Sequence, residues 1–128
     1  MDGQFTFSVD RATSLVRIKM AGLFTRADVA AFVEARRRAH STLGCGPNRH
    51  LTLNDVRQMK IQTQEIVAEF RLMLSDPAFR SRRLAFVAAP TLARGQLLRA
   101  LQDRDARCFE TIEAAEAWLF AEARSEAA

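Results

Sequence analysis

Several features that define whole classes of protein are scarce in this sequence of 128 residues. No apolar run approaches the roughly 18 residues that a membrane-spanning helix needs, so we expect no stable membrane insertion. The first residues, Met1–Gln4, include an acidic side chain and no apolar segment, so we expect no secretory signal. The two cysteines, Cys45 and Cys108, show no pairing pattern, which favours a reducing compartment and a cytoplasmic location.

Lysine is also scarce, because Lys19 and Lys60 are the only lysines among 19 basic residues. The net charge of +4 is the kind of excess that nucleic-acid-binding proteins carry. The arginines are nevertheless spread over every segment, among 15 acidic residues. The single run, Arg36–Arg38, falls near the end of a predicted helix, where the helix dipole favours cations. Basic charge without a groove-reading motif is weak evidence, so we expect no nucleic-acid partner.

The remaining composition is that of an ordinary globular protein, with 48% hydrophobic and 27% charged residues. A chain of this length is the usual size of one domain and can bury a substantial core. We therefore expect a single domain over residues 1–128. Residues 124–128 are expected to form a frayed tail.

Hydrophobic periodicity predicts two strands and a helix in the first third of the chain. Apolar and polar residues alternate over Phe5–Val9 and again over Leu15–Ala21, a pattern typical of two strands in an antiparallel hairpin. Thr25 and Asp28 form a capping-box-like start for a helix that runs to about Leu43.

The rest of the chain alternates strands and helices. Strands are predicted at Leu51–Val56, Leu84–Ala89 and Ala106–Phe109. Helices are predicted at about Thr63–Ser75, from Pro90 to about Asp103, and from Thr111 through Phe120 or beyond. Strands that alternate with helices imply right-handed crossovers and a mostly parallel sheet. The order ββαβαβαβα thus predicts an α/β fold with a mostly parallel five-stranded sheet and an antiparallel N-terminal edge strand.

One face of this sheet is predicted to be polar near the hairpin. If the register allows, six polar residues share that face, opposite the apolar Phe5, Phe7, Ile18 and Met20: Thr6, Ser8, Arg17, Lys19, Thr52 and Asn54. Helices would then pack mainly on the other side of this half, leaving a surface open to solvent or to a partner.

Two pairs of polar residues are candidates for a functional surface. Asp55 and Arg57 lie where the central strand meets its loop, the edge at which such sheets bind ligands. Alternatively, Asp55 accepts hydrogen bonds from loop amides and Arg57 makes a surface ion pair. Arg36 and His40 fall within the apolar stripe of the first helix. They either form a buried polar site or mark where this face leaves the core, with the Arg36 stem buried and its head in water.

No catalytic, cofactor or metal site is predicted. His40, Cys45 and His50 are spaced by five residues, but no fourth ligand is evident and the spacing matches no structural zinc pattern. A nucleophilic Cys45 would need a base and a residue to orient that base, and the sequence indicates neither. Cys108, in a short strand, is interpreted as a small buried hydrophobic residue.

Three segments resemble the SpoIIAA-like (STAS/SEC14-type) family, which is related to the STAS domains of anti-sigma-factor antagonists. These segments are Gly22–Val29 (GLFTRADV), Asn54–Arg57 (NDVR) and Phe109–Leu119 (FETIEAAEAWL), and the resemblance extends over nearly the whole chain. It implies a βα superhelix around a mixed sheet and a bacterial cytoplasmic protein.

The resemblance also implies a place for a phosphoswitch. STAS phosphoswitch domains carry a serine in an Asp-Ser-Ser-Gly-like turn at a helix N-terminus. The corresponding segment here, Ile61–Glu65, has neither the Asp-Ser pair nor the glycine, and only Thr63 offers a hydroxyl group. A phosphate there would lie at a helix N-terminus, which favours anions. A plain N-cap explains Thr63 equally well, so we expect no intact serine phosphoswitch.

These observations lead to three hypotheses for function. The first is a non-enzymatic regulatory or protein-interaction module that forms a homodimer or binds a protein partner. The second is a carrier or sensor of a small apolar ligand in a SEC14-like pocket, and the third is an enzyme whose site uses unremarkable residues. The candidate partner or ligand surface comprises Asp55, Arg57, Gln62, Thr63, Arg36 and His40.

Overall fold

The computed structural model describes residues 2–44, 46, 48–92, 94–95 and 106–127, without the side chains of 122–127. Its elements are β1 (Gln4–Asp10), β2 (Leu15–Gly22), α1 (Arg26–Ser41), β3 (Leu51–Met59), α2 (Gln64–Ser75), the 3-10 turn η1 (Pro77–Phe79), β4 (Arg83–Val87), β5 (Ala106–Phe109) and α4 (Ile112–Ala127). Most of the helix predicted between Pro90 and Asp103 lies outside the described residues.

The five strands form one sheet in the order β1-β2-β3-β4-β5. β1 is antiparallel to β2, whereas β2, β3, β4 and β5 are mutually parallel. This arrangement confirms the predicted α/β fold and the antiparallel N-terminal edge strand. β3 therefore lies at the centre of the sheet, and its side chains face a covering layer on each side.

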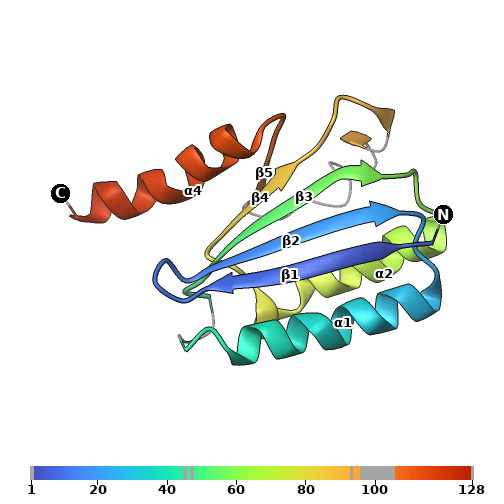
Figure 1. Cartoon of the computed structure of the whole chain (residues 1–128), viewed down its shortest axis with the longest axis horizontal. Coiled ribbons are helices and arrows are strands. Elements are labelled where there is room, and N and C mark those ends of the chain that lie inside the picture. Colours follow the sequence, from blue (N-terminus) through green and yellow to red (C-terminus); the bar gives the residue numbers. More distant parts are fainter. Residues whose placement is uncertain (1, 45, 47, 93, 96–105, 128) are drawn as a thin grey trace.

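Helices cover the two sides of the sheet unequally (Figure 1). α1 and α2 lie on one side, where the larger apolar core includes Ile18, Phe32 and Phe86. α4 lies on the other side against β3, β4 and β5, where Leu53 and Leu119 belong to a second core. No helix among the described residues combines the length and apolarity needed to cross a membrane.

Local signals explain where the helices begin. Thr25 caps α1 in a complete capping box with Asp28: the Thr25 hydroxyl accepts the Asp28 amide at 3.1 Å, and the Asp28 carboxylate accepts the Thr25 amide at 2.9 Å. Thr63 caps α2 in the simpler way, with its hydroxyl accepting the Ile66 amide at 3.2 Å. Both helix starts agree with the sequence analysis.

The register corrects the predicted polar face in one respect. Asn54 pairs with Ile18, and Thr52 pairs with Val16. Because paired residues of neighbouring strands share a face, Thr52 and Asn54 point towards α1 and α2, inside the larger core. The assignment of Thr52 and Asn54 to the open face was wrong. Alternation along β3 shows which of its residues share a face, but it does not show on which side of the sheet that face lies relative to β2.

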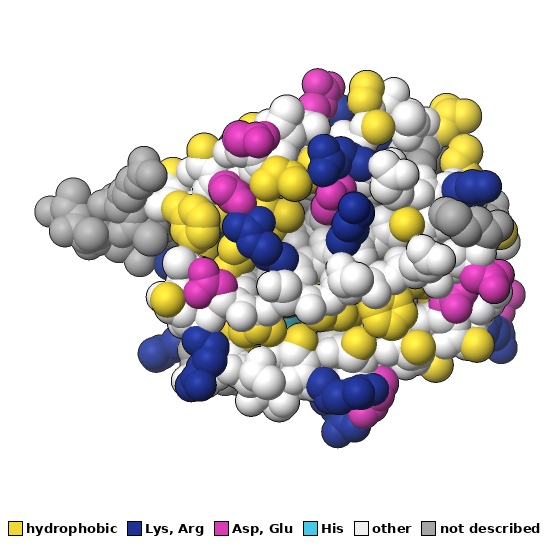
Figure 2. All heavy atoms as spheres, in the orientation of Figure 1, with side chains coloured by type: hydrophobic (Ala, Val, Ile, Leu, Met, Phe, Trp, Pro, Cys, Tyr) yellow, Lys and Arg dark blue, Asp and Glu magenta, His cyan; other side chains and the backbone are white. Residues whose placement is uncertain are grey.

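The hairpin part of that prediction is confirmed. Thr6 pairs with Lys19 and Ser8 pairs with Arg17, on the side away from α1. Thr6, Ser8 and Lys19 are exposed, because α4 packs over the far half of the sheet. Figure 2 shows cationic and anionic side chains close together on this side of the molecule. The β1–β2 half of the sheet thus presents an open polar face.

A register shift interrupts the β2–β3 pairing near the end of β3. Lys19 pairs with Asp55 but Ala21 pairs with Gln58, so β3 carries one extra residue opposite Met20. Such a bulge changes the phase of alternation. Val56 and Met59, three positions apart, therefore both contact the core beneath α1 and α2. The bulge also lengthens β3 to Met59, beyond the predicted end at Val56.

The last element of the fold is the predicted C-terminal helix. α4 continues from Ile112 to Ala127. Its last two turns are rich in alanine, glutamate and arginine, which have high intrinsic helix propensity. Their composition therefore sustains the helix.

Candidate functional site

A cavity of about 140 Å³ lies between the sheet and the two helices α1 and α2. Its described walls come from β2 (Ile18, Met20), α1 (Phe32, Arg36, His40), β3 and its loop (Thr52, Asn54, Val56, Arg57, Met59, Lys60, Gln62), α2 (Val67, Phe70, Met73, Leu74), the segment before β4 (Phe79, Arg80, Ser81), and β4 with the residues after it (Leu84, Phe86, Ala88, Ala89, Thr91, Arg94). Most of this surface is apolar, with a minority of polar groups.

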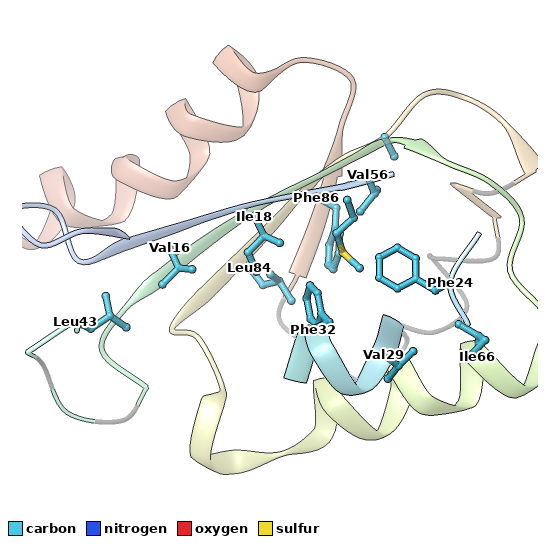
Figure 3. Packing of buried hydrophobic residues seen from close by; sticks show 12 residues of the cluster. Val16, Ile18, Phe24, Val29, Phe32, Leu43, Val56, Ile66, Leu84 and Phe86 are labelled. Carbon is cyan, nitrogen blue, oxygen red and sulfur yellow. The ribbon is translucent and has the colours of Figure 1, made fainter. Parts of the chain in front are cut away.

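Helical spacing on α1 places Phe32, Arg36 and His40 in one row along the cavity. Phe32 points towards Ile18, Leu84 and Phe86 of the sheet (Figure 3). The row therefore changes from apolar to polar along α1, towards the end of the cavity where β3 begins.

Arg36 is half-buried and holds the end of α2. Its Nη1 donates to the Met73 carbonyl at 3.0 Å, and its guanidinium lies over the Phe79 ring at 4.4 Å from the centroid. The Nε atom is buried without a hydrogen-bond partner. In the described part of the chain no carboxylate forms an ion pair with Arg36. Burial lowers the pKa of Arg36, but an arginine stays cationic at neutral pH.

His40 lies one helical turn beyond Arg36, between two aromatic rings. Its ring centroid is 4.5 Å from that of the buried His50 and 5.0 Å from that of Phe79. Burial, reinforced by His50 and Arg36, lowers the pKa of His40 to about 4. His40 is therefore neutral at pH 7 and offers one donor and one acceptor nitrogen.

The central strand contributes a second polar row opposite α1. Thr52 and Asn54 are two residues apart on the cavity face of β3. The Thr52 hydroxyl hydrogen bonds to the Ser81 hydroxyl at 2.6 Å. Asn54 is 7% exposed, and its Oδ1 atom is buried without a hydrogen-bond partner. Leaving such an acceptor unsatisfied costs about 1–3 kcal/mol.

Asp55 and Arg57, for which a ligand or partner anchor and a structural role were both considered, bind each other. The Arg57 guanidinium donates to both carboxylate oxygens of Asp55, at 2.9 and 2.8 Å, and the Arg57 amide donates to Oδ1 at 3.1 Å. These hydrogen bonds from Arg57 lower the pKa of Asp55. Asp55 is 6% exposed and pairs with Lys19 in the sheet register, so its side chain lies on the face opposite the cavity's polar row.

Gln62 and Thr63 occupy structural positions at the start of α2. Gln62 is 7% exposed: its Oε1 accepts the Phe24 amide, and its Nε2 donates to the Gly22 and Lys60 carbonyls. Gly22 has a φ of +82°, a backbone conformation that glycine adopts most readily. Thr63 is exposed and serves as the N-cap of α2. Gln62 therefore joins two loops from inside the protein.

The structure describes two of the three residues that were considered as possible metal ligands. His40 and His50 are neighbours through their rings, whereas Cys45 lies outside the described residues. In the part of the chain that the structure describes, no group of three or more histidine, cysteine or acidic residues is arranged to hold a metal ion. Cys108 is half-buried against the larger core, and burial raises the pKa of its thiol.

The cavity unites Arg36 and His40 with Thr52, Asn54 and Ser81, which the sequence analysis did not select as site residues. The sequence contained a signal for Thr52 and Asn54, because polar residues at alternate positions of a central strand indicate a polar row on a buried face. Ser81 carries no comparable signal, since it lies in an irregular segment before β4.

The parallel strands, the antiparallel edge strand and the flanking helices define a SpoIIAA-like fold. A crystal structure of an uncharacterised DUF3478-family protein with a SpoIIAA-like fold, from Shewanella loihica PV-4, matches with a TM-score of 0.70. The match covers 91% of this chain and 94% of the other at 14% sequence identity. No protein-family model matches the sequence, and no curated protein is similar to it.

Proposed function

We propose that this protein is a non-enzymatic, STAS-like binding module that carries or senses a small, largely apolar ligand. The cavity between the sheet and α1 and α2 supports this proposal. Protein interiors are normally packed as densely as organic crystals, so a space of about 140 Å³ is unusual. An engineered apolar cavity of about 150 Å³ binds benzene, which sets the size of the ligand's apolar body.

The unused hydrogen-bonding groups support a ligand over an empty packing defect. Arg36 Nε and Asn54 Oδ1 are both buried without partners, and both residues line the cavity. Buried polar groups in native proteins are nearly always paired, and an exception indicates a bound partner or a function. A ligand with an apolar body and a polar head would fill the space and satisfy these groups together.

Native mass spectrometry of protein purified gently from its own cells tests this proposal. We expect a non-covalent mass increment that disappears on denaturation. Ala88→Leu should abolish it, because Ala88 is 3% exposed, lines the cavity, and would extend three extra carbons into it. Ala30→Leu, the same change at an exposed position of α1, should retain the ligand.

Circular dichroism shows whether each of the two variants folds. A wild-type protein that never carries an increment would contradict the proposal. Equal retention of the compound by a folded Ala88→Leu variant would also contradict it, because the compound would then bind elsewhere.

A protein-interaction role is a second candidate, favoured by the free edge of β1, with a second copy of the chain as the partner. β1 is the edge strand, spans seven residues and contains no lysine, arginine or proline. Such an edge presents backbone donors and acceptors that pair with another strand unless charges or prolines block them. Antiparallel pairing of two β1 strands would join two sheets in a homodimer.

Charges placed on β1 test the homodimer. The double variant Thr6→Lys/Ser8→Lys should convert a dimer into a monomer, because four lysines would meet across the two-fold axis. Light scattering after size-exclusion chromatography measures the mass. Ser41→Lys/Ser75→Lys, with the same added charge at the ends of α1 and α2, should remain dimeric. A monomeric wild type, or a dimeric Thr6→Lys/Ser8→Lys variant, would contradict this role.

A further inference from the structure

One end of the cavity, where β3 begins, is lined by a group of neighbouring polar side chains. Arg36 and His40 come from successive turns of α1, and both contact the Phe79 ring. Ser81 follows Phe79 by two residues, and its hydroxyl reaches Thr52 of β3. The walls away from this end include the apolar Met20, Val56, Phe70 and Ala88. They also include the polar Arg57, Lys60, Gln62, Thr91 and Arg94, which lie at and beyond the ends of β3 and β4. A ligand in this cavity would therefore be amphipathic, with its head towards α1 and the beginning of β3.

Two arginines line the polar end, and of these Arg36 is half-buried whereas Arg80 is exposed. Arg36 uses Nη1 for the Met73 carbonyl and has no ion-pair partner among the described residues, so the other donors of its guanidinium fork stay available. His40 is neutral at pH 7 and adds no further positive charge. One desolvated guanidinium matches one negative charge, and its planar fork matches a carboxylate.

Asn54 supplies an independent sign that this end binds a polar group. Its side chain is 7% exposed and lines the cavity, and its Oδ1 has no partner. The amide presents an acceptor to a ligand hydroxyl or, after a turn of 180°, a donor to a carboxylate oxygen. Either contact would satisfy a group that the protein alone leaves unpaired.

We propose that the ligand is a small monocarboxylic acid with an apolar body, whose carboxylate binds Arg36 beside Asn54 while its body lies among Val56, Phe70 and Ala88. This inference rests on the proposed ligand-binding function and specifies the ligand's chemistry. A cavity on the scale of a benzene ring limits the body to roughly six to eight carbons. A neutral compound of the same shape would fill the apolar part but leave the guanidinium unpaired.

Matched pairs of probes test the charge without requiring the natural ligand. Phenylacetate is compared with phenylacetamide, and hexanoate with hexanamide, by calorimetric titration of the ligand-free full chain at pH 7.5. A charge-assisted hydrogen bond contributes enough for the carboxylate of each pair to bind roughly 10- to 100-fold more tightly. In nitrogen-15 NMR spectra, the Asn54 side-chain amide signals should shift on adding the carboxylates.

Two arginine variants separate the specific contact from general charge. Arg36→Met should reduce the preference to less than about 3-fold while the amides bind as before, since the stem is retained and the fork is lost. Arg37→Met removes the same charge from the exposed side of α1 and should leave the preference unchanged. Arg36→Met also removes the bond to the Met73 carbonyl, so its fold is checked by circular dichroism.

The wild-type comparison decides the inference even if Arg36→Met does not fold. Equal or tighter binding of the amides would overturn the carboxylate assignment and leave the ligand-binding function standing. Failure of all four probes, together with a native protein that carries no extra mass, would overturn both. A preference that survives in a folded Arg36→Met variant would place the carboxylate elsewhere and overturn the role of Arg36.

Discussion

Replacing Phe24 by alanine is expected to lower the free energy of unfolding by about 3–5 kcal/mol, the range typical of a buried phenylalanine. Phe24 is 2% exposed, and its ring contacts Phe5, Phe32 and Phe70 at centroid distances of 6.4, 6.4 and 5.5 Å. The backbone of Gly3 lies so close that a Cβ atom there would be 2.6 Å from the Phe24 ring. Alanine would leave a cavity where the N-terminus, α1 and α2 meet.

Chemical denaturation measures this loss, and thermal unfolding should show a midpoint lower by about 10–20 °C. Leu23→Ala is the matched control, because Leu23 precedes Phe24 and is 40% exposed. A leucine at the surface contributes little, so this variant should lie within about 0.5 kcal/mol of the wild type. Similar losses for the two variants would show that Phe24 does not hold the N-terminal half of the core.

The same aromatic cluster shows why the architecture could be predicted from the sequence. Phe5 and Phe7 alternate with polar residues, which predicted a strand, and Thr25 with Asp28 predicted the start of α1. These signals are local, because they depend on the pleat of a strand and on the capping of a helix. The order of strands and helices then restricts the topology to right-handed crossovers in a mostly parallel sheet.

The cavity could not be predicted in the same way, because it depends on which strand faces meet. The alternation of Thr52 and Asn54 along β3 was visible, but only the pairing with Val16 and Ile18 shows that these residues face α1. Likewise, Arg36 was identified in an apolar stripe, yet its position above Phe79 depends on how α1 packs against the segment before β4. Register and packing are long-range properties that local patterns leave open.

Gln62 was predicted to lie on a partner or ligand surface; it lines the cavity, and its contacts also give it a structural role. Its amide joins the loop after β2 to the loop after β3, with bonds of 2.8 Å to the Phe24 amide and 2.9 Å to the Gly22 carbonyl. Gln62→Leu should lower the free energy of unfolding by about 2–4 kcal/mol. Leucine keeps much of the volume but leaves the Phe24 amide buried without an acceptor.

Gln58→Leu makes the same chemical change at an exposed position of β3, so it should alter the free energy of unfolding by less than about 0.5 kcal/mol. Urea denaturation of the two variants compares them directly. If both unfold at the same urea concentration, the Phe24 amide must find another acceptor, and Gln62 would be available to a ligand. If only Gln62→Leu is destabilised, its amide is committed to the fold, and Arg36 and Asn54 remain as the groups that can recognise a ligand.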